Sequence, residues 1–119
     1  METIKIAEQI NYKISQLDNA KKALKSISEE KAVALAEYEK QLAKVVIQLK
    51  NGVEFDIDGE SISNPPTTIL EKIAKGICWQ KSLNKDKTES AYKNLIKGID
   101  ILESQLNGYQ SINRYQSET

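Results

Sequence analysis

Apolar side chains recur at helical spacing along two long stretches of the chain, on either side of a short alternating segment. In the first stretch, steps of alternately four and three residues from Thr3 meet an apolar residue at ten of fourteen positions. A sustained period of 3.5 residues is typical of a coiled-coil seam and predicts one helix over about residues 3–50. Asn51 and Gly52 are expected to end it, because both tolerate left-handed backbone. The expected seam positions are Thr3, Ala7, Ile10, Ile14, Leu17, Lys21, Leu24, Ser28, Lys31, Leu35, Tyr38, Leu42, Val45 and Leu49.

Residues 53–62 change to the two-residue period of a half-buried strand. Asp58-Gly59 suits a two-residue turn in which both central residues have positive φ, so the segment predicts a β-hairpin. Its apolar face is expected to cover the end of a helix pair, and it comprises Val53, Phe55 and Ile57. Its acidic residues are expected to face solvent or a partner, and they are Glu54, Asp56, Asp58 and Glu60.

A second helix is predicted over about residues 65–107, after the Pro65-Pro66 pair and before Gly108, with residues 108–119 as a tail. Asn64 or Thr68 would cap its start. Its seam is expected at Leu70, Ala74, Ile77, Lys81, Asn84, Thr88, Ala91, Leu95, Gly98 and Leu102.

Folding at the hairpin turn pairs positions whose numbers add to 119, such as Leu49 with Leu70. This register also aligns a polar middle section on both helices. The fold class expected is mainly α: a single domain over 1–119, formed by an antiparallel two-helix coiled-coil hairpin with a short β-hairpin at its tip.

A second apolar stripe is predicted on each helix, and a lone helical hairpin cannot cover two stripes per helix. We therefore expect a homo-oligomer that forms a helical bundle. The second stripe comprises Ile6, Ala20, Ile27, Ala34 and Val46, then Ile69, Gly76, Trp79 and Leu83. Of these, Ile27, Trp79 and Leu83 are the expected oligomer contacts.

Composition argues against an enzyme. Seventeen basic and seventeen acidic residues cancel, although residues 53–64 carry four acids and no base. The chain has no histidine, one cysteine (Cys78) and no glycine-rich phosphate loop, so no catalytic constellation can be assembled. The hairpin acids lack the spacing of a calcium loop. No metal, cofactor, membrane span or signal peptide is expected, and the lone cysteine suits a reducing, cytoplasmic location.

The tail segment, residues 109–115, combines aromatic residues with the single arginine of the chain. Tyrosine and arginine are common anchors in interfaces, so Tyr109, Arg114 and Tyr115 are candidate partner-binding or ligand-binding residues. The alternative is a helix extension in which Tyr109 and Ile112 continue the seam.

Two stretches of the second half, residues 66–76 and 105–115, resemble small proteins of phages and prophages of Gram-positive bacteria. The resemblance covers roughly residues 53–115. Such proteins are encoded in early gene clusters near recombination and single-strand-binding genes, and have no established activity. The resemblance implies a viral accessory protein, such as an inhibitor of a host nuclease or defence system. By architecture alone the chain also resembles the β subunit of prefoldin.

The leading hypothesis is a non-enzymatic accessory protein that binds and modulates a host or phage protein of DNA metabolism or anti-phage defence. It would act in the cytoplasm of the bacterial host. One alternative is a nucleic-acid-binding or nucleotide-binding oligomer that uses its lysine faces, densest at Lys21, Lys22 and Lys25, with the tail. Another alternative is a prefoldin-like chaperone.

Overall fold

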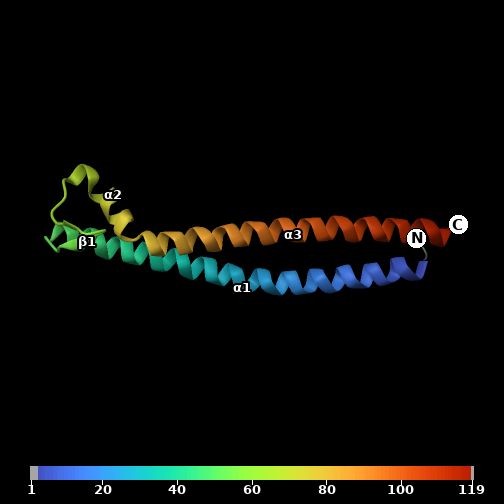
Figure 1. The fold of residues 1–119 in the computed structure, drawn as a ribbon. Helices are drawn as coiled ribbons and strands as arrows, with labels where there is room; N and C mark the ends of the chain where they lie inside the picture. Colours follow the sequence, from blue (N-terminus) through green and yellow to red (C-terminus); the bar gives the residue numbers. More distant parts are fainter. Residues whose placement is uncertain (1–2, 119) are drawn as a thin grey trace. The chain divides into compact units, whose positions relative to one another are not determined.

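The computed structural model describes residues 3–118, which are mainly helical (Figure 1). Within this range the elements are α1 (Thr3–Lys50), β1 (Phe55–Ile57), β2 (Glu60–Ile62), α2 (Thr67–Ile77) and α3 (Trp79–Glu118). The prediction of a mainly helical chain with a small antiparallel β-hairpin is confirmed. The predicted bounds of the first helix agree with α1.

The chain forms two compact units. Unit 1 contains the described residues up to Glu29 and those from Ser90 onward, and unit 2 contains Glu30–Glu89. Helices α1 and α3 contribute to both units, whereas the two strands and α2 belong to unit 2.

Unit 1 is a pair of helical segments with a thin apolar core. Ile6 and Leu17 of α1 and Ile99 of α3 are buried. The Thr3 hydroxyl donates a long hydrogen bond, 3.4 Å, to Oε1 of Gln116. The residue numbers of this pair add to 119, which is the pairing expected from the sequence.

Unit 2 has the larger core. It consists of Val45 and Leu49 from α1, Leu70 and Ala74 from α2, and Cys78 between α2 and α3. Partly buried side chains pack around it: Tyr38, Leu42, Val46, Phe55, Ile62, Ile73 and Ile77. Both strands thus meet α1 and α2 at one cluster, and Cys78 connects this cluster to the start of α3.

The end of α1 is formed as the sequence predicts. Gly52 has φ +80°, and the N–H groups of Gly52 and Val53 donate to the carbonyls of Leu49 and Gln48, at 3.2 and 3.0 Å. This pair of bonds is a Schellman motif, in which a left-handed residue after the helix lets the chain reverse.

The β-hairpin has the predicted turn. Asp58 and Gly59 have φ of 49° and 87°, and Phe55 pairs with Ile62 across the two strands. Phe55 and Ile62 pack on the core of unit 2. The expectation that Val53 shares this contact is wrong, because it precedes β1 and remains exposed.

The second predicted helix needs three corrections. It begins at Thr67 after Pro66, without the expected side-chain cap from Asn64 or Thr68. It is interrupted at Cys78, where ψ is 20°, so that α2 and α3 are separate helices. It also continues through Gly108 to Glu118, so residues 108–118 are helical and not a separate tail. A helical glycine costs only about 1 kcal/mol, which neighbouring burial offsets.

The buried face of α1 departs from the predicted seam in part of one of the seam's two heptad series. The series containing Ile10, Leu17, Tyr38 and Val45 is buried or half-buried as expected. In the other series, Ile14 and Leu35 are exposed, whereas Leu42 is half-buried and Leu49 is buried in the core of unit 2. The places of Ile14 and Leu35 inside each unit are taken by residues assigned above to the second stripe, namely Ile6, Ala20, Ile27 and Ala34. In α1 the second stripe is therefore covered within the chain itself, without a second copy.

Candidate functional site

The acidic residues of the β-hairpin all lie on the surface of unit 2, as predicted. Glu54 accepts a hydrogen bond from the Ser61 hydroxyl. Within residues 3–118, no hydrogen bond or ion pair joins the side chains of Asp56, Asp58 or Glu60 to the rest of the chain. Because the hairpin contains no basic residue, its negative charge is uncompensated locally.

A cleft of about 420 Å³ lies between the β-hairpin and the junction of α2 and α3. We call it the hairpin cleft, and it is lined by Asp56, Ile57, Asp58, Gly76, Ile77 and Trp79. Trp79 is 58% exposed, which is unusual for the largest apolar side chain of a protein. The structure thus brings together residues that the sequence assigned to two sites, the acidic hairpin and the oligomer contact.

A second hollow, of about 600 Å³, lies between the end of α1 and α2. We call it the α1–α2 groove. It is lined by Glu39, Leu42, Ala43, Val46, Ile47, Lys50, Thr67, Leu70 and Glu71. Ile47 is 59% exposed here, and Glu71 at the rim forms an ion pair of 3.4 Å with Lys75. The groove therefore has an apolar floor and a charged edge.

Sequence reasoning did not select Ile47. It lies beside Val46, outside the four-three seam, and the pattern of α1 alone gave it no role. A signal was present nevertheless, since Val45, Val46 and Ile47 form a run of three apolar residues. Such a run exceeds what one face of a helix can bury.

The polar side chains in the middle section of unit 2 contact one another across α1 and α3. Nζ of Lys81 lies 3.0 Å from Oε2 of Glu37, and Nζ of Lys85 lies 5.1 Å from the ring centroid of Tyr38. The residue numbers of the Lys81–Glu37 pair add to 118, one from the expected register. A cavity of about 250 Å³ occurs at the same level, lined by Lys31, Leu35, Lys85 and Glu89.

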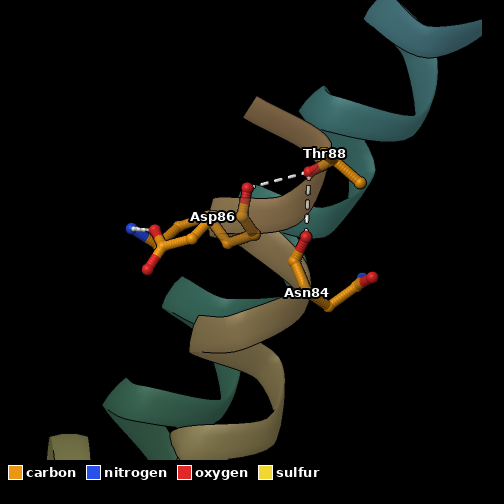
Figure 2. A network of polar contacts seen from close by, with 4 residues as sticks. Asn84, Asp86 and Thr88 are labelled. Atoms are coloured by element: carbon orange, nitrogen blue, oxygen red, sulfur yellow. Dashed lines mark hydrogen bonds and ion pairs between the residues drawn. The ribbon is translucent and has the colours of Figure 1, made fainter. Parts of the chain in front are cut away.

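Figure 2 shows the polar network of α3 in this section. The Thr88 hydroxyl donates to the backbone carbonyls of Asn84 and Lys85, at 3.1 and 2.9 Å. The side chain of Lys85 lies 3.1 Å from Oδ1 of Asp86, and this hydrogen bond raises the pKa of the Lys85 ammonium group. The hydroxyl of Thr88 is thus bonded to the backbone of its own helix, and Lys85 is paired with its neighbour Asp86.

Cys78 is part of the core of unit 2 rather than a reactive group. Its side chain is buried, and burial raises the pKa of the thiol because the thiolate loses hydration. A buried thiol with a raised pKa is a weak nucleophile.

The remaining sequence-predicted residues are in different surroundings. Tyr109 is half-buried in unit 1, whereas Arg114 and Tyr115 are exposed near the end of α3. The helical structure there supports the alternative interpretation of residues 109–115 as a helix extension. Ile112, which that interpretation placed in the seam, is nevertheless exposed. Leu83 is exposed and lies one turn after Trp79, whereas Ile27 is half-buried in unit 1.

Two further observations concern residues 3–118. They contain no group of three or more histidine, cysteine, aspartate or glutamate residues placed to hold a metal ion. In the same range, none of the helices is both long enough and apolar enough to cross a membrane.

Comparison of the chain with protein-family models, with curated proteins and with solved structures finds no match. The hairpin cleft and the α1–α2 groove, together with the sequence, therefore indicate what the protein does.

Proposed function

We propose that the protein is a non-enzymatic binding module that attaches to another protein through unit 2. The observation that carries this proposal is the α1–α2 groove, where Ile47 projects into solvent beside Leu42 and Leu70. Grooves with an apolar floor and a charged rim are the usual receptors for an amphipathic segment of a partner. Interfaces of this kind gain most of their affinity from a few buried apolar anchors.

The biological setting of the proposal comes from the sequence resemblance. Residues 66–76, which resemble part of a phage or prophage accessory protein, include most of α2, one wall of the groove. We propose that the partner is a host or phage protein of DNA metabolism or defence, and that occupation of the groove modulates or inhibits it. The setting is the cytoplasm of the bacterial host.

We also propose that α1 and α3 form an antiparallel coiled-coil hairpin and that copies of the chain associate. The two contacts Thr3–Gln116 and Glu37–Lys81 support the hairpin, since both fall within one residue of a single register. Exposed Trp79 and Leu83, one turn apart on α3, support association. Sedimentation at micromolar concentration tests it: we expect an oligomer, and a monomer would refute it.

The groove is tested by site-specific photo-crosslinking in a Gram-positive host. A benzophenone amino acid replaces Ile47, and the matched control replaces Gln105, an exposed polar residue of α3 in unit 1. We expect a discrete covalent adduct with one other protein from position 47 and none from position 105. The variant Ile47→Glu, produced in excess, should fail to compete for that adduct, whereas the unmodified chain should compete.

Three results would refute the proposal. The first is the absence of any adduct at position 47. The second is the same adduct from both positions, which would indicate collision rather than binding. The third is an adduct with a second copy of the chain alone, which would assign the groove to self-association.

A further inference from the structure

The hairpin cleft combines three elements that lie apart in the sequence. Strand β1 and the turn supply two carboxylates, from Asp56 and Asp58, and the last turn of α2 supplies Gly76 and Ile77. The first residue of α3 supplies Trp79. The break between α2 and α3 at Cys78 places an indole and two carboxylates around one hollow.

This combination selects for a planar cation. An indole face attracts cations through its quadrupole, and it binds guanidinium well because that group is flat and weakly hydrated. Carboxylates at the rim can accept hydrogen bonds from the guanidinium N–H groups, which the indole face does not pair. Within the described residues the side chains of Asp56 and Asp58 have no ion-pair partner, so neither acid is already neutralised.

We propose that the hairpin cleft receives an arginine side chain from a basic segment of the partner protein. This inference rests on the proposed function, since it names the chemistry of the partner that unit 2 binds. Charge complementarity is the argument for the occupant: residues 53–64 carry four negative charges and no positive one on a chain of zero net charge. The same charge repels nucleic-acid phosphates from the cleft.

Trp79 makes the proposal directly measurable, because it is the single tryptophan of the chain and lines the cleft. The purified full-length protein is titrated with a peptide of four arginines separated by glycines. We expect a saturable change in tryptophan fluorescence that weakens as salt is added. The same peptide with citrulline in place of arginine keeps the shape but loses the charge, and it should give no saturable change.

Two double variants separate the cleft from the charge of the hairpin. Asp56→Asn/Asp58→Asn removes the carboxylates that line the cleft, and asparagine also tolerates the positive φ of position 58. We expect it to weaken peptide binding by about fivefold or more, as for the loss of two exposed charge contacts. Glu54→Gln/Glu60→Gln removes the same charge from the same hairpin, outside the cleft lining. We expect less than about a twofold change there, because these two side chains do not line the cleft.

The inference fails if both double variants lose affinity equally, since hairpin charge alone would then explain binding. It also fails if the citrulline peptide binds as well as the arginine peptide. Neither failure affects the crosslink at position 47, which reports on the α1–α2 groove. A missing crosslink at position 47 together with a specific arginine response would instead refute the proposed role of the α1–α2 groove and support arginine binding in the hairpin cleft.

Discussion

Two leucines of α1 provide the sharpest test of the packing. The sequence pattern placed both Leu35 and Leu49 in the buried seam. In the structure Leu49 is 0% exposed within the core of unit 2, whereas Leu35 is 43% exposed. The same substitution, leucine to alanine, should therefore have different costs at two positions of one helix.

The expected magnitudes follow from burial. Truncation of leucine to alanine removes three carbon groups, worth about 0.8 kcal/mol each when fully buried, or about 2.4 kcal/mol. At Leu49 the cavity left beside Val45 and Leu70 raises the cost to about 3–5 kcal/mol. At Leu35 the loss is about 1 kcal/mol, because solvent already reaches the side chain and alanine has the higher helix propensity.

Urea unfolding followed by circular dichroism measures both variants. With a denaturant slope of about 2 kcal/mol per molar, Leu49→Ala should lower the midpoint by roughly 1.5–2.5 M and Leu35→Ala by roughly 0.5 M. Equal shifts would contradict this difference in burial and would favour the seam expected from the sequence, in which both leucines are buried.

Three further predictions concern two glycines and the buried thiol. Gly98→Ala should stabilise the protein by about 0.5–1 kcal/mol, because Gly98 is helical and an added Cβ meets no atom within 4 Å. Gly52→Ala should destabilise the protein by about 1 kcal/mol or more, because position 52 has a left-handed φ. The same urea assay measures both glycine variants, and a destabilised Gly98→Ala or a stabilised Gly52→Ala would contradict the reasoning. Burial raises the pKa of Cys78, so the folded state holds this proton more tightly than the unfolded state, whose pKa is 9.0. The contribution of the thiol to stability is complete below about pH 9 and declines above it. Between about pH 8 and pH 10 the native chain should therefore lose urea stability relative to Cys78→Ala, which has no thiol to ionise. A difference between the two midpoints that does not change with pH would contradict the assignment.

Local chain reversals could be predicted from the sequence because they depend on single residues. Gly52 adopts the positive φ that ends α1, and Asp58-Gly59 adopts the positive φ values of the hairpin turn. At such positions the backbone conformation excludes most side chains, so the residue type is informative without knowledge of the packing.

The choice of buried face could not be predicted in this way. Hydrophobic spacing predicts two adjacent apolar stripes on α1. The stripe with the larger side chains, such as Leu35, is the more hydrophobic one, so the pattern favours its burial over that of Ala34. Burial depends on the side chains opposite, and Ala34 is 3% exposed although its side chain is small. The pattern of one helix carries no information about those opposite side chains.

The candidate site was predicted in part for a related reason. Exposure of Asp56 and Asp58 follows from strand alternation, which is a local property. Their proximity to Trp79 follows from the interruption at Cys78, which no helix-ending signal marks apart from Gly76 two residues earlier. A continuous helix over these residues was the simpler prediction, and it would not have placed an indole beside the hairpin.

Both proposed surfaces depend on the same five-residue core of unit 2. Leu70 lines the α1–α2 groove and belongs to the core, while Cys78 joins the helices whose junction forms one side of the hairpin cleft. A change that loosens this core should therefore weaken the crosslink at position 47 and the fluorescence response of Trp79 together. Changes confined to either surface should affect one readout alone. If a core variant loses both readouts and each surface variant loses only one, the groove and the cleft are two separate sites on one rigid unit. If each surface variant loses both readouts, they belong to a single extended patch.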